Sequence, residues 1–326
     1  MLSVSNQLLV FFDIIIVNWN AGNQLYECLK SIEAAHRDGF KLSRVVVVDN
    51  ASTDGSADDC LDNIDLPLVI IRNAQNLGFA AACNQGATGS IADYLLFLNP
   101  DTKLFPESLS IPIRFMEQPE NAKIGICGIQ LVDDQGEVAR TCARFPAPGM
   151  FFTKMLGLNM LFPRYFPSYI MSEWDHEETC EVDQVMGAFF LIRRNLFETM
   201  GGFDERFFVY FEEVDLSRRA YNKGWRTAYL ADAQAFHRGG GTSEQIKAMR
   251  MFYSLRSRIL YGYKHFSWIS ATLLMAGTLF VELISRLALS IGRRSGREAK
   301  ETLKGYAMLW RAMPQLLKNS WNGGRQ

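Results

Sequence analysis

The residues that could do chemistry in this chain are polar side chains that follow short apolar runs. Leu95–Leu98 is such a run, and Asn99-Pro100-Asp101 follows it directly. Proline has no N–H for a sheet and disfavours helix at the residue before it, so a buried strand should end there and present Asp101 beyond it. Ligands of open α/β sheets bind at such carboxyl ends. Taken by itself, however, this motif is more often a turn that caps the next helix.

Three further polar groups follow apolar runs in the first third of the chain. They are Asn18-Trp19-Asn20, Asp49-Asn50-Ala51-Ser52-Thr53-Asp54-Gly55 and Asn76-Leu77-Gly78-Phe79. An aspartate at the end of the second strand could accept from a pyrimidine N–H or a ribose hydroxyl, so the set could bind a nucleoside. The chain has no Gly-x-Gly-x-x-Gly after the first strand and no Gly-x-x-x-x-Gly-Lys-Ser/Thr. These absences argue against a dinucleotide dehydrogenase and a P-loop NTPase.

A second set of candidate residues is acidic and lies near residue 213. If a helix begins near Glu212, then Glu212, Glu213 and Asp215 lie in its first turn, where the helix dipole favours them. Asp215 can pair with Arg218 or Arg219 at helical spacing, which predicts a structural role. Adjacent like charges at Glu212 and Glu213 gain little from being neighbours. A functional role is therefore predicted for that pair.

Alternating strands and helices must bring these residues together. Apolar runs predict strands at residues 13–17, 45–48, 68–71 and 94–98, and helical spacing predicts helices at 25–35, 56–64 and 79–87. This alternation predicts an α/β fold with a parallel, doubly wound sheet. A helix at 107–116 and strands at 124–129, 184–192 and 226–230 are predicted to follow. Residues 133–181 have no clear period, which fits either an acceptor-binding lid or a packed surface loop.

The polar motifs, taken in order, resemble those of the family 2 glycosyltransferases of the GT-A fold, and especially the bacterial rhamnosyltransferase branch. The likeness covers about residues 12–243 and rests on Val17-Asn18-Trp19-Asn20, Val48–Ser56, Asn76–Ala80 with Asn84, and Asn99-Pro100-Asp101. It implies a Rossmann-like, mostly parallel sheet flanked by helices. A sugar-nucleotide half at about 12–102 and an acceptor and catalytic half at about 103–243 are expected. The sugar-nucleotide contacts that it implies are Val17, Asn18, Asn20, Asp49, Asn50, Asn76, Gly78, Asn84, Asn99 and Asp101.

The resemblance also implies a metal site and a general base. The family's Asp-x-Asp motif has Asn99 at its first position here, and Asp101 remains an oxygen ligand suited to Mg²⁺ or Mn²⁺. The family places a metal-binding histidine at His237, although a lone histidine is more often structural. Its Glu-Asp-x-Asp segment places the acid that deprotonates the acceptor at Glu213, with Glu212 as the alternative base.

Two residues of the strand predicted at 184–192 are expected to contact the acceptor. They are Met186 and Gly187, and a glycine inside a strand marks a place where another group approaches the backbone closely. The run that follows His237 also resembles a hydrolase oxyanion loop. The chain has no Gly-x-Ser-x-Gly nucleophile elbow, so the esterase interpretation is discarded.

Composition and charge bound the cellular setting. The chain has 326 residues, 48% of them hydrophobic and 21% charged, which is typical of a globular protein. Six cysteines without metal-binding spacing indicate reduced thiols in a cytoplasmic protein. The apolar run at 8–17 has no preceding Lys or Arg and contains Asp13, which favours a first strand over a signal peptide. Residues 244–326 carry 14 Lys and Arg against 4 Asp and Glu, so this region should contact an anionic surface.

The same C-terminal region contains the most apolar segment of the chain, residues 268–292. Glu282 and Arg286 interrupt it, and a central charge costs about 2.5–3.5 kcal/mol in a span, so an interfacial or re-entrant helix is favoured. Trp268 would lie at the membrane boundary. The cations expected against anionic headgroups are Arg293, Arg294, Arg297, Lys300 and Lys304. A buried core helix or a homodimer helix is the alternative.

Together these features predict an inverting, metal-dependent glycosyltransferase at the cytoplasmic face of the plasma membrane, attached peripherally or by a re-entrant helix. The predicted donor is dTDP-L-rhamnose, and the predicted acceptor is a polyprenyl-diphosphate saccharide of surface polysaccharide assembly, such as O-antigen. No nucleic acid partner is expected. One alternative is an inert sugar-nucleotide-binding membrane scaffold, which the departures at Asn99 and Glu213 favour. A nucleotidyltransferase is the other, but it needs a cationic loop that Asn18–Ala21 does not provide.

Overall fold

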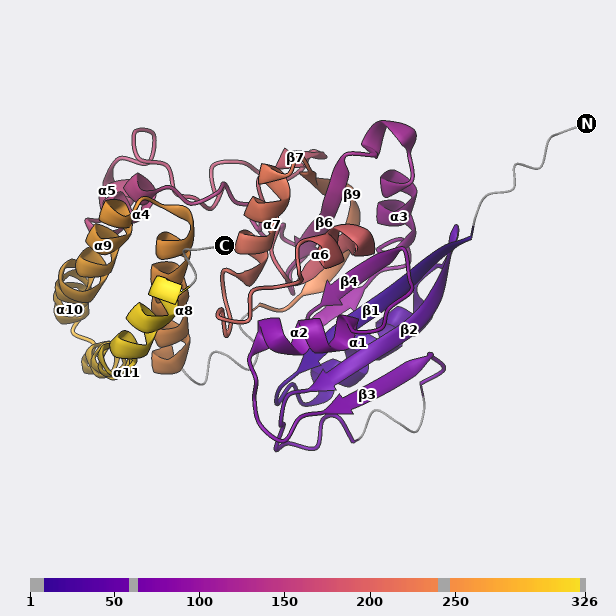
Figure 1. Ribbon diagram of the computed structural model, residues 1–326, viewed down its shortest axis with the longest axis horizontal. Coiled ribbons are helices and arrows are strands. Elements are labelled where there is room, and N and C mark those ends of the chain that lie inside the picture. Colours follow the sequence, from indigo (N-terminus) through magenta and orange to yellow (C-terminus); the bar gives the residue numbers. More distant parts are fainter. Residues whose placement is uncertain (1–8, 59–63, 240–246, 323–326) are drawn as a thin grey trace, which may run out of the picture.

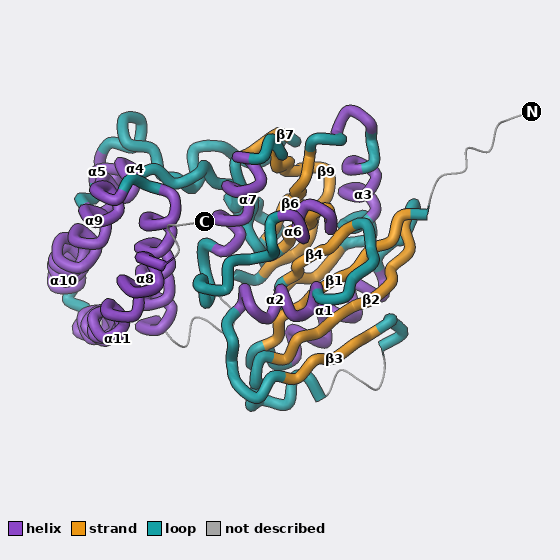
Figure 2. The backbone as a smooth tube through the Cα atoms, viewed as in Figure 1, coloured by secondary structure: helices purple, strands orange, loops and turns teal. Residues whose placement is uncertain are grey.

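The chain folds around one nine-stranded sheet with helices on both faces, and its last helices lie beside the sheet (Figure 1). The computed structural model describes residues 9–58, 64–239 and 247–322, with side chains as far as residue 318. The strand order is β3-β2-β1-β4-β8-β6-β9-β5, and β7 pairs with β9. Figure 2 shows the strands as one layer with helices around it. The predicted α/β class, a sheet flanked by helices, is confirmed.

The first half of the sheet is the parallel unit that the alternation of strands and helices predicts. It contains β1 (Val10–Asn18), β2 (Phe40–Asp49), β3 (Leu68–Arg72) and β4 (Tyr94–Leu98), with α1 (Asn23–Ala34) and α2 (Phe79–Ala87) between strands. β1 pairs in parallel with β2 and β4, and β2 with β3. The helix predicted at 56–64 is a turn as far as Asp58, and residues 59–63 lie outside the described residues.

The apolar runs of this unit are buried on both faces, which explains why they are continuous rather than alternating with polar residues. Ile14 and Ile16 of β1 point into one core, whereas Ile15 and Val17 point into another on the opposite face. α1 closes the first core and α2 the second. The polar residues that follow β1 and β2 consequently meet at one edge, where Asn18 lies opposite Asp49.

The second half of the sheet is mixed. It contains β5 (Thr102–Leu104), β6 (Ile124–Val132), β7 (Cys180–Val182), β8 (Phe189–Arg193) and β9 (Arg226–His237), with α3 (Ser110–Met116), a 3₁₀ turn (Pro119–Asn121), α6 (Arg194–Thr199) and α7 (Glu212–Asn222). β8 is antiparallel to β4 and β6, whereas β6 and β9 are parallel.

Two predicted strands of this half have different bounds in the structure. The strand predicted at 184–192 begins only at Phe189, because Gln184 pairs with Ala143 and residues 187–188 form a turn. The strand predicted at 226–230 continues to His237, since its second part pairs with β6 and β5. Both differences place site residues. The turn leaves Met186 exposed beside Gly187, and the longer strand carries His237 to β5.

The insertion at 133–181 and the C-terminal helices pack around a third core. They contain α4 (Pro148–Met155), α5 (Leu158–Leu161), α8 (Lys247–His265), α9 (Trp268–Ala276), a π-helical turn (Gly277–Glu282), α10 (Leu283–Gly292) and α11 (Gly296–Asn322). Figure 1 shows these helices together at one side of the sheet. Phe151 of α4, Phe211 before α7, Tyr261 of α8 and Leu309 of α11 are buried in this core. The predicted boundary at 243/244 lies outside the described residues and stays a prediction, and described segments before and after it share this core.

Candidate active site

The loops that follow β1 and β2 are joined by hydrogen bonds between predicted site residues. Asn18 is fully buried, and its Nδ2 lies 2.9 Å from Asp49 Oδ1 and 3.0 Å from Ser52 Oγ. Asn20 adopts a left-handed conformation with φ of 52°. Its N–H donates to Ser52 Oγ over 3.0 Å, and its Oδ1 accepts from the Thr53 N–H over 2.7 Å. The protein itself therefore fixes the shape of this edge.

Asn50 joins the loop before α2 to the same edge. Its Nδ2 donates to Asn76 Oδ1 over 2.9 Å and to the Gly78 carbonyl over 3.2 Å, and its Oδ1 accepts from the Leu77 N–H over 3.0 Å. Gly78 has φ of 91°, and a Cβ there would lie 2.5 Å from the Phe208 carbonyl oxygen, so only glycine fits. The structure thus brings the predicted residues of three loops together. The side chain of Val17 instead lies in the second core.

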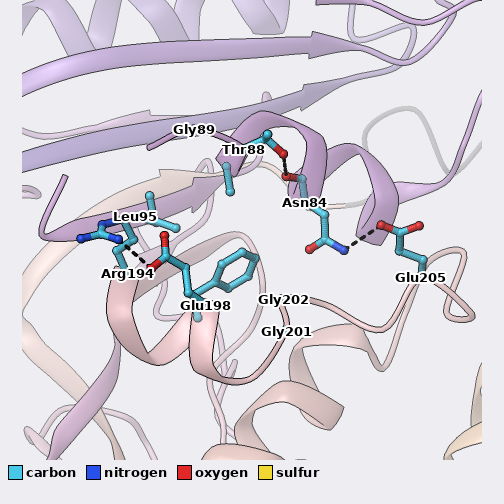
Figure 3. Close-up of a pocket in the computed structure, with 11 residues that line it drawn as sticks. Asn84, Thr88, Gly89, Leu95, Arg194, Glu198, Gly201, Gly202 and Glu205 are labelled. Carbon is cyan, nitrogen blue, oxygen red and sulfur yellow. Dashed lines mark hydrogen bonds and ion pairs between the residues drawn. The ribbon is translucent and has the colours of Figure 1, made fainter. Parts of the chain in front are cut away.

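Asn84 lies on α2, where its amide is engaged by the loop before α7. Its Nδ2 donates to the Phe203 carbonyl over 2.8 Å and to Glu205 Oε1 over 3.0 Å. Figure 3 shows Asn84 and Glu205 facing each other beside a hollow of about 340 Å³. Leu95 at the start of β4 and Arg194, the first residue of α6 after β8, also line this hollow, so it extends away from the carboxyl end of β4. A sugar-nucleotide contact for Asn84 stays a prediction.

Asp101 and His237 meet because β5 pairs with β9. Thr102 lies opposite His237 in that ladder, and His237 Nε2 is 3.4 Å from Asp101 Oδ1. The two side chains are only 10% and 14% exposed. Their separation is long for a hydrogen bond, whereas neighbouring ligands of an octahedral ion at about 2.1 Å lie about 3 Å apart. An oxygen and an imidazole nitrogen so placed fit two positions of a Mg²⁺ or Mn²⁺ shell. Among the described residues, no group of three His, Cys, Asp or Glu side chains forms a metal site.

The residues after β4 are connected to the acids of α7 through the turn before β8. The Asn99 N–H donates to the Ala188 carbonyl over 3.0 Å. Next to Ala188, Gly187 lies over Glu213, whose Cδ is 4.0 Å from the position that a Cβ on Gly187 would occupy. Met186 is 39% exposed beside it. The turn before β8 thus links Asn99 to Glu213 through Ala188 and Gly187, and the roles of these residues stay predictions.

The start of α7 is held in an unusual backbone conformation. Tyr210 and Phe211 have φ of 69° and 71°, which is rare for residues other than glycine and costs about 1 kcal/mol or more for each. Such conformations persist only where the surroundings determine them, and Phe211 is buried in the third core. The packing of two aromatic residues therefore sets the direction in which Glu212 and Glu213 leave the helix.

Both of these glutamates carry an oxygen that is buried and unsatisfied. Glu212 Oε2 and Glu213 Oε2 have no hydrogen-bond partner within the described part of the chain. Desolvation raises the pKa of Glu212 well above its ordinary value of 4.5, and the nearby charges of Glu213 and Asp215 raise it further. Desolvation also raises the pKa of Glu213, although backbone hydrogen bonds oppose this. Carboxyl groups with raised pKa values are typical of sites where a proton is taken up and released. The two glutamates therefore fit a catalytic role better than that of permanently charged structural carboxylates.

Asp215, in the same first turn of α7, has the opposite environment. It is fully buried, and Arg219 Nε donates to its Oδ2 over 2.8 Å, which confirms the predicted pairing with Arg219. Lys264 and His265 of α8 lie 2.7 and 2.8 Å from its Oδ1. Burial alone would raise the pKa of Asp215, but the hydrogen bond from His265 and the charges of Arg219 and Lys264 outweigh burial and lower it. This carboxylate anchors α8 to the helix that carries the glutamate pair.

Sequence reasoning missed the residues that α8 brings to the site. Lys264 and His265 have no motif around them, and only the structure places them on Asp215. Tyr253 stacks on Phe208 with ring centroids 4.4 Å apart, and the Phe208 carbonyl accepts the Phe79 N–H at the start of α2. The aromatic residues at 207–211 were visible in the sequence, but their partners on α8 lie more than 40 residues away.

Comparison with known proteins shows which family has this arrangement. The family model for glycosyl transferase family 2 matches residues 13–201, more than half of the chain. The chain belongs to glycosyl transferase family 2. This glycosyltransferase is also similar to named bacterial rhamnosyltransferases. It is 25% identical over 305 residues to the N-acetylglucosaminyl-diphospho-decaprenol L-rhamnosyltransferase of Mycobacterium tuberculosis, covering 88% of this chain and 95% of the relative.

Another relative and a solved structure extend these similarities. The rhamnosyltransferase WbbL of Escherichia coli K12 is 28% identical over 172 residues, covering 52% of this chain and 61% of the relative. The crystal structure of S. aureus TarS 1–349 in complex with UDP-GlcNAc superposes with a TM-score of 0.55 at 16% identity. It covers 95% of this glycosyltransferase and 81% of that chain. The match confirms the predicted fold, a mostly parallel sheet flanked by helices with a helical C-terminal region.

Proposed function

We propose that this glycosyltransferase transfers L-rhamnose from dTDP-L-rhamnose, with inversion, to a hydroxyl of a lipid-linked saccharide in bacterial surface polysaccharide assembly. The observation that carries the proposal is the position of Glu213. Its carboxylate lies under Gly187, next to the residue whose carbonyl accepts the Asn99 N–H, and has an oxygen without a partner among the described residues. A carboxylate kept unsatisfied at that edge suits a base that binds the attacking hydroxyl.

The two glutamates of the pair would have separate roles. The pKa of Glu212 is raised more strongly by burial and by its acidic neighbours, so the pair holds its proton mainly there and Glu213 is left ionised to accept one. Glu213 would take the proton of the acceptor hydroxyl as the oxygen attacks the anomeric carbon from the face opposite the diphosphate. Glu212 remains the alternative base.

Asp101 and His237 would hold a divalent ion. When bound, Mg²⁺ or Mn²⁺ neutralises charge on the departing diphosphate. The protein supplies one carboxylate oxygen and one imidazole nitrogen from paired strands, so the diphosphate must provide further ligands. The loops held by Asn18, Asn50 and Asn76 would bind the nucleoside.

The lipid-linked acceptor and attachment to the cytoplasmic face of the plasma membrane are supported by the names of the relatives and by the C-terminal helices. The Mycobacterium tuberculosis relative is named for a diphospho-decaprenol substrate. Residues 268–292 form a helix long and apolar enough to cross a membrane, in which one 18-residue window has a mean hydropathy of 1.7 and is 28% buried. Glu282, which argued against a span, is buried and paired with Arg258 and Arg286. The outer face of this helix is therefore more apolar than its sequence suggests.

The test is a panel of sugar nucleotides offered to the purified full chain with Mn²⁺ and with EDTA. Metal-dependent release of dTDP from dTDP-L-rhamnose, increased by a polyprenyl-diphosphate saccharide, is the expected result. Release of UDP or GDP in place of dTDP would refute the proposed sugar. Binding without metal-dependent release from any member of the panel would favour the inert scaffold.

Membrane attachment needs a separate test that keeps the fold. Deleting α11 is unsuitable because Tyr306 and Leu309 are buried in the third core. Replacing Arg293, Arg294 and Arg297 by glutamate should instead lower binding to vesicles that contain phosphatidylglycerol, while thermal unfolding stays unchanged. Equal binding of both proteins would refute a role for this basic segment.

A further inference from the structure

Two arginines bind one carboxylate where the insertion meets the C-terminal helices, and a lysine lies near them. Arg286 donates to Glu282 Oε1 from Nε and Nη2 over 3.0 and 2.7 Å, and Arg258 pairs with Glu282 Oε2. The third cation is Lys154, at the end of α4. No carboxylate lies within 4 Å of Lys154 among the described side chains. The group therefore has an excess of two positive charges.

Packing between α4 and the π-helical turn brings these residues together. A Cβ on Gly277 would lie 3.0 Å from Met155 Sδ, so α4 rests directly on the helix that carries Glu282. Lys154 Nζ lies 5.3 Å from the ring centroid of Tyr169. Desolvation lowers the pKa of Lys154, and the charge of Arg258 lowers it further while Glu282 opposes the change. The charges of Arg258 and Glu282 therefore both act on the Lys154 ammonium group.

The cluster has an unsatisfied donor and two accessible cations. Arg258 is 6% exposed, and its Nε has no hydrogen-bond partner within the described residues. Its Nη2 donates to Thr278 Oγ1 over 2.9 Å, so the guanidinium is held in place. Lys154 is exposed, and the Arg286 side chain is 38% exposed. An anion could approach Lys154 and Arg286 from outside, with Arg258 beneath them.

Apolar side chains are exposed on both sides of these cations. On the insertion they are Leu156, Met160, Leu161 and Phe162, and on the apolar C-terminal helix they are Phe280, Val281, Ile284, Leu289 and Ile291. Figure 1 shows α5 and α10 at the same end of the molecule. A ligand that suits this surface has an anionic head and a long apolar chain.

The cluster is one aromatic layer away from the glutamate pair. The ring of Phe151, which lies 5.6 Å from the Arg258 guanidinium, is 5.8 Å from the ring of Tyr169. Tyr169 in turn lies 6.5 Å from Phe211, the residue before Glu212. Desolvation raises the pKa of Tyr169. The charge of Arg258 opposes this rise and the charge of Glu213 adds to it, so Tyr169 lies within electrostatic range of both residues.

We propose that Lys154, Arg258 and Arg286 bind the diphosphate of a lipid-linked acceptor. The isoprenoid chain lies along the exposed apolar residues of α5 and α10, and the saccharide passes Tyr169 to reach Glu213. The two excess positive charges match the two negative charges of a diphosphate diester, and arginine suits its oxygens. The inference rests on the proposed function for its acceptor, but the binding site can be tested without transfer.

The first test measures binding of farnesyl diphosphate and of farnesol to the full chain in detergent micelles. Lys154→Gln and Arg286→Gln should each weaken farnesyl diphosphate binding about tenfold and the double variant about a hundredfold, while farnesol binding stays unchanged. Lys41→Gln is the matched control, because Lys41 is exposed near the amino end of β2. Equal weakening for both ligands, or no weakening in the double variant, would overturn the site.

A second test separates the acceptor from a membrane headgroup and from the proposed function. If the double variant loses phosphatidylglycerol vesicle binding by the same factor as farnesyl diphosphate binding, the cluster is a general headgroup site and the acceptor assignment fails. If transfer occurs and the KM for a diphosphate-linked acceptor is unchanged in the double variant, the site fails while the proposed function stands. If the wild type transfers no sugar but farnesyl diphosphate binding follows the variants, the diphosphate site stands and the transferase proposal fails.

Discussion

Polar side chains are held differently in two regions of the molecule, the loops after β1 and β2 and the first turn of α7. In the loops, Asn18 Nδ2 donates to Asp49 and Ser52, which holds that edge in shape without a ligand, although Asn18 Oδ1 has no partner among the described residues. In the first turn of α7, Glu212 and Glu213 each keep a buried oxygen without a partner among the described residues. We infer that the protein preorganises the nucleotide-binding loops, whereas the carboxylate of the base gains its hydrogen-bond partner only when an acceptor hydroxyl binds.

The largest effect is expected from replacing Glu213, which has a buried oxygen without a partner among the described residues. Glu213→Gln keeps the shape of the side chain but cannot accept a proton, so kcat should fall by about 10² to 10⁴. Binding of the sugar nucleotide, measured by titration calorimetry, should stay within about twofold, because the loops that hold it are unchanged. Glu120→Gln, at an exposed glutamate, is the control. Equal loss of binding and transfer would make Glu213 a structural residue.

Replacing Asp215, in the same turn of α7, should lower stability much more than catalysis. Asp215→Asn leaves Arg219, Lys264 and His265 without their shared charge, and breaking a buried ionic network costs about 3–5 kcal/mol. Urea unfolding should show this loss, whereas Glu213→Gln should unfold like the wild type. The activity of Asp215→Asn per folded molecule should fall much less than that of Glu213→Gln. A variant that is stable but inactive would move Asp215 into the chemistry.

Asp101 and His237 allow a test of whether the strand ends need a bound metal ion. His237→Ala should raise the Mn²⁺ concentration for half-maximal activity by about 10- to 100-fold, and high Mn²⁺ should restore most of the rate. The control is His36→Ala, since His36 is exposed and pairs with Glu107. An unchanged Mn²⁺ requirement would show that His237 binds no metal.

Gly187 offers a milder change at the boundary between the two regions. A Cβ there would lie in ordinary contact with Glu213, at 3.9 Å from Cγ, so Gly187→Ala should fold normally. Its methyl group would cover part of the carboxylate, and the KM for the acceptor should rise several-fold with the KM for the sugar nucleotide unchanged. Gly149→Ala, at a glycine with nothing within 4 Å, is the control. A change in the sugar-nucleotide KM alone would place the acceptor elsewhere.

The smallest expected effect concerns stability and pH. Because burial raises the pKa of Glu212, the native state keeps a proton that the unfolded chain releases above pH 4.5. The stability of the wild type relative to Glu212→Gln should therefore be greatest near pH 4 and decline as pH rises toward the raised pKa, by on the order of 1 kcal/mol. Thermal unfolding of both proteins from pH 4 to 8 measures it. A constant difference would mean that Glu212 is ionised in the folded protein.

Much of the fold could be predicted because its signals are local. The helix bounds at Phe79–Ala87 and the strand at Tyr94–Leu98 match the prediction, and α7 begins at Glu212 as expected. β5 was not predicted, since three residues are too few to show a period. The resemblance to family 2 glycosyltransferases supplied the roles of Asp101, Glu213 and His237, which the residues alone left open.

The sequence by itself determined where strands end, where the acids enter a helix and which family the motifs resemble, because periodicity, proline and helix starts act over a few residues. Only the tertiary structure decided that Gly187 covers Glu213, that His265 anchors Asp215 and that Lys154 lies with Arg258 and Arg286. Each of these contacts joins residues 26 or more positions apart. They depend on how the third core packs α4, α7 and α8 together, and no local pattern encodes that packing.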